Sequence, residues 1–271
     1  MKIAEIKEAL NHNPCAQFLE ELAQDERSGV QKLLAAYYKK QEAEAAEYER
    51  FNKMLLYEKQ CYEQGAQYVA GVDEAGRGPL AGPMVIGAVI LPQNVFIKGL
   101  NDSKKLTAAK REKLYDEILE KALAVSVNIV SVYNIDRLNI YRATQEGMAE
   151  VLANLKIRPQ VALIDAMPVQ AEGIKTYSVI HGDALSASIA AASVIAKVTR
   201  DRMMEKLAVE FPQYDWVHNK GYGSGAHMQA ILEYGATCWH RRSYEPVKSM
   251  HLPDVEAMPN KLIRLPEEDN G

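Results

Sequence analysis

"YVAGVDEAGRGPLAGP", residues 68–83, joins a short apolar run to an acidic pair and a glycine-rich segment. The apolar run, residues 68–72, is typical of a buried strand, because β-branched and aromatic residues favour pleated, buried backbone. Asp73 and Glu74 follow it directly, and three glycines and two prolines come after them. Glycine lets backbone groups approach a ligand without a Cβ atom in the way, and proline restricts the conformations of a loop. The stretch predicts a strand that ends in two carboxylates and a binding loop.

Short apolar runs after this stretch predict the remaining strands of a sheet. They lie at residues 84–91, 124–132, 161–164 and 176–180. Helical patterns separate some of these runs or follow them, at residues 107–121, 141–155, 184–209 and 226–234. Strands that first succeed one another and then alternate with helices predict a mixed five-stranded sheet flanked by helices. We expect this α/β domain to occupy residues 67–252.

The first 66 residues have a different texture, which predicts a small helical unit. Between Gly29 and Gly65 there is neither glycine nor proline, and apolar residues recur at spacings of three, four and seven. This pattern indicates one long amphipathic helix or two closely joined helices. Residues 2–10 and 14–24 are expected to form two shorter helices.

Composition limits the class of protein and its location. The chain has 271 residues, 48% of them hydrophobic, and a net charge of −4, so it can bury a large core but does not attract polyanions as a whole. Its three cysteines are far apart in sequence and no apolar run approaches eighteen residues. We therefore expect a cytoplasmic monomer with reduced thiols and no membrane insertion. Residues 253–271 are polar and are expected to form a frayed tail.

Four carboxylates fall where predicted strands end. Asp73 and Glu74 end the first strand, Asp165 ends the run at 161–164, and Asp183 follows the run at 176–180. Such positions can meet at one edge of a sheet, where α/β proteins bind ligands. Crowded carboxylates raise one another's pKa unless a cation neutralises them, and hard oxygen ligands suit Mg²⁺ or Mn²⁺. No Cys and His spacing suits zinc.

Each acid also has a simpler structural interpretation. Asp183 could cap a helix, Asp73 could form a turn, and Asp165 could pair with a buried cation. Recurrence at the ends of three strands favours the metal site over these separate roles. Similarly, the basic stretch at 98–113, with six Lys or Arg against two acids, is either a solvated surface or a contact for nucleic acid.

Several longer blocks are specific enough to carry a resemblance to a known family. They are "GVDEAGRGPLAGPMVIGAVIL", "LNDSKKLT", "LIDA", "HGDALSASIAAASVIAKVTRDRMM", "HNKGYGSGAH" and "HRRSYEPV". In this order, over about residues 68–248, the blocks resemble bacterial ribonuclease HII. The resemblance implies an RNase H-like fold and hydrolysis of RNA in RNA/DNA hybrids. It also implies cleavage 5′ of ribonucleotides embedded in duplex DNA by two ions, Mn²⁺ or Mg²⁺, leaving a 3′-hydroxyl and a 5′-phosphate.

Site residues follow from the resemblance position by position. The expected catalytic metal ligands are Asp73, Glu74, Asp165 and Asp183. The GRG motif, which reads the ribose 2′-OH through backbone contacts, corresponds to Gly76, Arg77 and Gly78. Tyr222 corresponds to the tyrosine that stacks on the deoxyribose after the ribonucleotide. Further contacts with the substrate strands are expected from Ser103, Lys104, Lys105, Lys197 and Arg200.

The chain also departs from the family pattern, and other functions compete with it. Ser224 stands where the family more often has threonine, which puts local phosphate contacts in doubt. A transposase-like nuclease would also gather carboxylates, but it would not call for GRG beside them. A non-catalytic hybrid-binding module would gain nothing from acids facing phosphates. A nucleotide-binding enzyme would need a lysine-bearing phosphate loop, which the sequence lacks. The slightly acidic residues 1–66 could dock on the catalytic domain or on a partner, and we expect docking with some help in substrate binding.

Overall fold

The computed structural model of the protein describes residues 1–250, so the predicted tail at 253–271 lies outside the described residues. The chain divides into two compact units, Met1–Met54 and a second unit that begins at Leu55. Within residues 1–250, no helix combines the length and the apolar character that a membrane span requires.

The first unit is helical, as expected. It consists of α1 (Ile3–Leu10), α2 (Ala16–Ala23) and α3 (Ser28–Met54). Their apolar faces form one small core from Ile6, Leu10, Leu22, Val30 and Leu34. Asn13 has a positive φ of 48° between α1 and α2, immediately before Pro14, so the two helices are separate. The long glycine-free stretch also forms two helices, because α3 ends at Met54 and α4 (Leu56–Glu63) follows after one residue.

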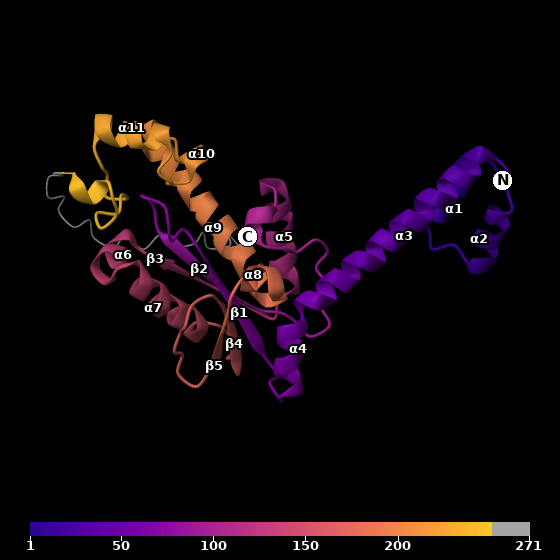
Figure 1. Ribbon diagram of the computed structural model, residues 1–271, viewed down its shortest axis with the longest axis horizontal. Coiled ribbons are helices and arrows are strands. Elements are labelled where there is room, and N and C mark those ends of the chain that lie inside the picture. The colour runs from indigo at the N-terminus through magenta and orange to yellow at the C-terminus, as the bar shows by residue number, and fades with distance from the viewer. Residues whose placement is uncertain (251–271) are drawn as a thin grey trace, which may run out of the picture. The chain divides into compact units, whose positions relative to one another are not determined.

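A five-stranded mixed sheet forms the centre of the second unit (Figure 1), and the expected fold class is confirmed. The strands are β1 (Val69–Ala75), β2 (Met84–Ile90), β3 (Ala124–Val130), β4 (Val161–Asp165) and β5 (Lys175–Val179). Their order in the sheet is β3-β2-β1-β4-β5. Strands β1, β2 and β3 are antiparallel neighbours, whereas β4 runs parallel to β1 and β5 runs parallel to β4. The carboxyl ends of β1, β4 and β5 therefore lie at one edge.

Helices cover both faces of this sheet (Figure 1). The remaining α-helices are α5 (Ala108–Lys121), α6 (Val132–Leu138), α7 (Ile140–Ala153), α8 (Gly182–Leu185), α9 (Ala187–Glu210), α10 (Trp216–Asn219) and α11 (Gly225–Tyr234). Short 3₁₀ turns occupy η1 (Ser103–Lys105), η2 (Pro212–Tyr214) and η3 (Val247–Ser249). Helix α7 packs on one face through Met148 and Val151, and α9 packs on the other.

Two serine residues make the helices differ from the expected boundaries. The strand expected at 124–132 ends at Val130, because the Ser131 hydroxyl accepts a hydrogen bond from the Asn134 N–H at 3.2 Å and begins α6. The single helix expected at 184–209 is two helices. Ser186 has extended backbone between α8 and α9, and its hydroxyl accepts from the Ile189 N–H at 3.2 Å.

Helix α9 approaches the sheet unusually closely. A Cβ atom on Gly71 of β1 would lie 2.0 Å from the Ser188 carbonyl carbon, and one on Gly87 of β2 would lie 2.7 Å from the Ala192 oxygen. The helix contributes alanines and serines to this contact, so its backbone can rest on the strands. The small residues of α9 therefore allow its close packing on the sheet.

Helix α4 belongs structurally to the second unit. Glu58 is buried, and its Oε1 accepts hydrogen bonds from the Ser186 hydroxyl at 2.6 Å and the Ser188 N–H at 2.9 Å. Cys61 packs in the same core cluster as Val69 of β1. The compact units divide after Met54, whereas the expected domain limit at residue 66 lies just beyond α4.

Two N-terminal deletions test where the catalytic unit begins. Removing residues 1–54 leaves α4 in place, so the remaining chain should unfold at nearly the same urea concentration as the second unit of the full protein. Removing residues 1–66 also removes α4 and leaves the partners of Glu58 unsatisfied, which should lower the free energy of unfolding by about 3 kcal/mol or more. Urea titration followed by tryptophan fluorescence measures both. Equal stability of the two shortened chains would contradict this role of α4.

Candidate active site

Three aspartates converge at the edge of the sheet where β1 and β4 end. Asp73 lies in β1, Asp165 is the last residue of β4, and Asp183 lies in α8 just after β5. Because β1 and β4 are parallel neighbours, with Val72 opposite Ile164, the two strand-end acids adjoin. One carboxylate oxygen from each of the three aspartates lies within 4.8 Å of the others. The structure thus brings together three of the four predicted metal ligands.

The cluster is buried and electrostatically unfavourable on its own. Burial raises the pKa of Asp73 well above its usual range, and the neighbouring Glu74 and Asp165 charges raise it further. Burial and the Asp183 charge raise the pKa of Asp165. Two backbone donors offset part of this cost: the Glu74 N–H donates to Asp73 Oδ1 and the Gly182 N–H donates to Asp165 Oδ1, each at 2.7 Å. A cation would stabilise all three charges.

Glu74 lies beside the three-aspartate cluster and not within it. Its Oε1 is 3.5 Å from Arg77 Nη1, and its Oε2 is buried without a hydrogen-bond partner among the described residues. Burial raises its pKa, although Arg77 opposes that shift. An unpartnered buried carboxylate oxygen next to three other carboxylates fits a hard cation, because every available donor is oxygen.

The contacts of Asp73 and Asp183 differ from their simpler interpretations as a turn residue and a helix cap. Asp73 lies inside β1 opposite Gly87, so it does not form a turn. Asp183 makes no cap, since Ser186 caps α9. Its Oδ2 lies 3.3 Å from Lys104 Nζ, and although burial alone would lower the pKa of Lys104, the Asp183 and Asp73 charges raise it.

The GRG loop is held from behind by two residues, Arg241 and Tyr244, that were not predicted to contact it. Arg241 is fully buried and donates to the carbonyl oxygens of Gly76 at 2.5 Å and Arg77 at 2.7 Å. The Tyr244 hydroxyl also donates to the Arg77 carbonyl, at 2.6 Å. A trans peptide directs its C=O and N–H to opposite sides, so the N–H groups of Arg77 and Gly78 point away from Arg241. The signal in the sequence was the block "HRRSYEPV", which resembled the family without suggesting a contact.

Arg200 also supports this loop, a position that differs from the expected contact with substrate. It is 1% exposed, and its guanidinium donates to the carbonyls of Pro83 at 3.0 Å, Ala81 at 3.1 Å and Lys220 at 2.9 Å. Burial lowers its pKa to about 10, so it stays charged at neutral pH. Gly76 has a φ of +96°, and a Cβ atom there would lie 2.0 Å from Arg200 Nε, so only glycine fits.

The other predicted substrate residues divide into buried and exposed groups. Ser103 is 3% exposed and its hydroxyl lies 2.8 Å from that of Ser193, while Lys197 is paired with Asp201 at 2.6 Å. In contrast, the side chains of Lys104 and Lys105 are largely exposed on η1.

Tyr222 lies beside the GRG loop and is 49% exposed. A Cβ atom on Gly78 would lie 3.6 Å from Tyr222 Cε1, so the tyrosine ring and the glycine are neighbours. The two segments are joined by the backbone, because the N–H groups of Leu80 and Ala81 donate to the Gly221 carbonyl at 2.8 and 3.2 Å. Ser224, the departure from the family pattern, caps α11 by accepting from the His227 N–H at 3.2 Å.

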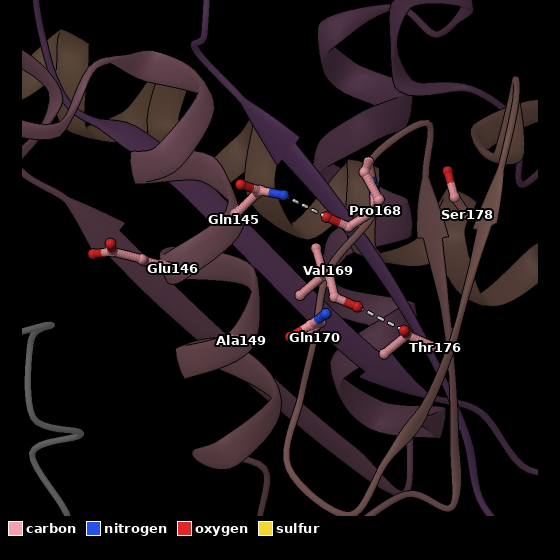
Figure 2. A pocket seen from close by; sticks show the side chains of 8 residues that line it. All are labelled: Gln145, Glu146, Ala149, Pro168, Val169, Gln170, Thr176 and Ser178. Carbon is pink, nitrogen blue, oxygen red and sulfur yellow. Dashed lines mark hydrogen bonds between the residues drawn. The ribbon is translucent and has the colours of Figure 1, made fainter.

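A separate cavity of about 560 Å³ lies between α7 and β5. Figure 2 shows Gln145 donating to the Pro168 carbonyl and Thr176 donating to the Val169 carbonyl on its wall. None of its lining residues belongs to the aspartate cluster or to the GRG loop. The candidate metal ligands therefore lie outside this cavity.

Comparison with known proteins matches most of the chain to one family. The ribonuclease HII family model matches residues 70–247, and the ribonuclease HII N-terminal domain model matches residues 2–62. Ribonuclease HII of Bacillus cereus is 52% identical over 229 residues, which is 84% of this chain and 89% of that protein.

Solved structures share the fold. Ribonuclease H2 from Pyrococcus horikoshii OT3 has a TM-score of 0.60 and 30% identity, covering 68% of this chain and 96% of that chain. Bst-RNase HIII in complex with Mn²⁺ has a TM-score of 0.54 and 17% identity, covering 69% of this chain and 70% of that chain, a likeness of fold alone. Together with the clustered aspartates, the family matches show that this chain belongs to the ribonuclease HII family and is a metal-dependent endoribonuclease acting on RNA in RNA/DNA hybrids.

Proposed function

We propose that this enzyme also cuts duplex DNA on the 5′ side of a single embedded ribonucleotide and leaves a 3′-hydroxyl and a 5′-phosphate. The observation that carries the proposal is the adjacency of the GRG loop and Tyr222, next to the acidic pair that begins the site. The acidic pair, the GRG loop and Tyr222 adjoin within one chain, and we propose that the enzyme acts as a monomer.

The proposed ligands of two divalent cations, Mg²⁺ or Mn²⁺, are Asp73, Glu74, Asp165 and Asp183. Support comes from the three oxygen atoms within 4.8 Å, the raised pKa of Asp73 and the unpartnered oxygen of Glu74. Bst-RNase HIII, a protein of the same fold, is described with Mn²⁺. Bound divalent cations supply positive charge that activates water and stabilises a departing oxygen. The protein's own part is to fix the carboxylates on two strands and one short helix.

The GRG loop is the proposed reader of the ribose. RNA differs from DNA by its 2′-OH, which both donates and accepts hydrogen bonds. With the carbonyls of Gly76 and Arg77 bound to Arg241, the N–H groups of Arg77 and Gly78 are directed away from that side chain and can meet the 2′-oxygen. Tyr222 beside Gly78 would stack on the next sugar and thereby favour a ribonucleotide followed by DNA.

The remaining predicted substrate contacts, four basic residues and Ser103, take two proposed roles. Lys104 and Lys105 are exposed and would contact phosphates. Ser103, Lys197 and Arg200 are bound to other parts of the protein, so we assign them to supporting these contacts. The helical unit Met1–Met54 is proposed to assist substrate binding, in line with the match of residues 2–62 to an N-terminal domain of this family.

Cleavage of an end-labelled DNA duplex with one ribonucleotide tests the proposal directly. The expected product is a single cut on the 5′ side of the ribonucleotide in Mg²⁺ or Mn²⁺, none in EDTA, and none on all-DNA duplex or single-stranded RNA. A polymerase that extends the product identifies its 3′-hydroxyl. Cleavage confined to continuous hybrids would contradict recognition of the lone ribonucleotide.

Replacing one ligand tests the metal assignment. Asp73→Asn should lower the cleavage rate by more than about a hundredfold, since loss of even an outer partner of a metal ligand costs about 10–100-fold. Binding to an RNA/DNA hybrid should persist, because the change removes negative charge facing phosphates. Asp215→Asn makes the same charge change outside the cluster and should leave the rate unchanged. Normal turnover by Asp73→Asn would remove Asp73 from the proposed ligand set.

Tyr222→Ala tests the stacking role. The ratio of kcat/KM on a lone ribonucleotide to that on a continuous hybrid should fall about tenfold, the range expected for loss of one aromatic stack. Tyr222→Phe keeps the ring and should keep the ratio. The thermal midpoint should change little in either variant, because the side chain is half-exposed. An unchanged ratio in Tyr222→Ala would reject stacking by this residue.

A further inference from the structure

Two buried histidines lie behind Tyr222 and have no part in the function described so far. His227 is in the first turn of α11, and His240 pairs with Ala81 just beyond the GRG loop. They are 0% and 1% exposed, and their ring centroids are 5.2 Å apart. Trp216 and Tyr214 complete the same core, with stacked rings 5.2 Å apart.

The hydrogen bonds of His240 fix the place of its proton. The Thr237 backbone N–H, which can only donate, lies 2.9 Å from His240 Nδ1. Nδ1 therefore accepts, and the proton of the neutral ring is on Nε2. That nitrogen lies 3.1 Å from His227 Nε2 and donates to it.

An independent donor fixes the proton of His227. The indole N–H of Trp216, also an obligatory donor, lies 3.0 Å from His227 Nε2. Nε2 therefore carries the lone pair and Nδ1 carries the proton, which is donated to the Tyr222 carbonyl at 2.9 Å. Both rings are neutral, because burial lowers the pKa of His227, and burial together with His227 lowers that of His240 to about 3. The occupied Nε2 atoms leave no lone pair for a metal ion.

This chain of hydrogen bonds ends on Tyr222, whose side chain is half-exposed. Half of Tyr222 is exposed, so the direction of its ring depends on its backbone. The Tyr222 N–H donates to the Asn219 carbonyl at 2.9 Å, and its own carbonyl accepts from the Ser224 N–H at 2.8 Å and from His227. The buried network fixes the His227 side chain, and His227 in turn holds the peptide group that contains the Tyr222 carbonyl.

We propose that His227 and His240 are positioning residues for junction recognition, which orient Tyr222 beside Gly78 through its carbonyl oxygen. The proposal rests on the proposed stacking function of Tyr222. If the proposal is correct, loss of the Nδ1 donor of His227 changes the substrate preference. If the histidine pair only fills the core, its substitution changes the stability alone.

Two substitutions at one position separate these roles. In His227→Asn the amide nitrogen can take the place of Nδ1 and still donate to Tyr222, but Trp216 and His240 lose their acceptor. In His227→Gln the amide lies near the place of Nε2 and can accept from both, but the donor to Tyr222 is lost. Stability should therefore be higher in the Gln variant, and substrate preference should be better preserved in the Asn variant.

The measured quantities are the thermal midpoint and the ratio of kcat/KM on a lone ribonucleotide to that on a continuous hybrid. His227→Gln should lower the ratio about tenfold, as in Tyr222→Ala, and His227→Asn should stay within about threefold of the wild-type ratio. Tyr214→Phe, which removes a hydroxyl that donates to the Gly235 carbonyl in the same core, should lower stability without changing the ratio. If the ratios of the two His227 variants follow their stabilities, the positioning role is overturned.

The outcomes for Tyr222 and for the histidines are distinguishable. A lower ratio in Tyr222→Ala with a wild-type ratio in His227→Gln overturns only the positioning role. An unchanged ratio in Tyr222→Ala overturns the stacking role and this inference with it. Imidazole ¹⁵N chemical shifts of the intact protein give a readout besides activity: protonation of His227 at Nδ1 and of His240 at Nε2 is expected, and the opposite tautomers would overturn the proposal.

Discussion

The close contact between α9 and the central strands determines the geometry of the rest of the site. Only because Gly71 and Gly87 lack side chains can the α9 backbone rest on β1 and β2. The same helix then carries Ser193 to the hydroxyl of Ser103 and Arg200 to the carbonyls behind the loop. A shift of α9 away from the sheet would move these supports together, because they lie on one rigid element.

Two buried positive charges of the site are kept apart from its acids, whereas Arg77 and Lys104 lie beside Glu74 and Asp183. The carboxylates are gathered at the sheet edge, where their repulsion favours a cation, and two buried guanidiniums lie behind the loop with no carboxylate partner among residues 1–250. Arg200 and Arg241 instead donate hydrogen bonds to backbone carbonyls. Each carbonyl oxygen carries only a small partial negative charge, but each guanidinium binds several of these oxygens. This arrangement keeps Arg200 and Arg241 from neutralising the acids, and it uses cationic donors to shape a loop rich in glycine and proline.

Local sequence was enough to predict the sheet, the acids and the loop, because each depends on neighbours in the chain. Asp73 and Glu74 follow an apolar run, and glycine around Arg77 marks a backbone-lined loop. Partners distant in the sequence could not be predicted. Arg241 contacts residues more than 150 positions earlier, and Arg200, which was expected to contact the substrate, is buried in the fold. Ser186 separates α8 from α9, and its hydrogen-bond partner Glu58 reaches it only in the folded chain. The pairing of the two histidines has no local signal, because Trp216, His227 and His240 meet only in the folded chain.

Holding the loop by guanidinium groups has a consequence for how the enzyme responds to acidity. Guanidinium retains its proton over the whole physiological range, even where burial lowers its pKa as in Arg200. The hydrogen bonds that hold the GRG loop therefore do not titrate in that range, while burial raises the pKa of the carboxylates a short distance away. For the proposed recognition of the ribose, acidification would weaken the capacity for hydrolysis before it altered the choice of sugar.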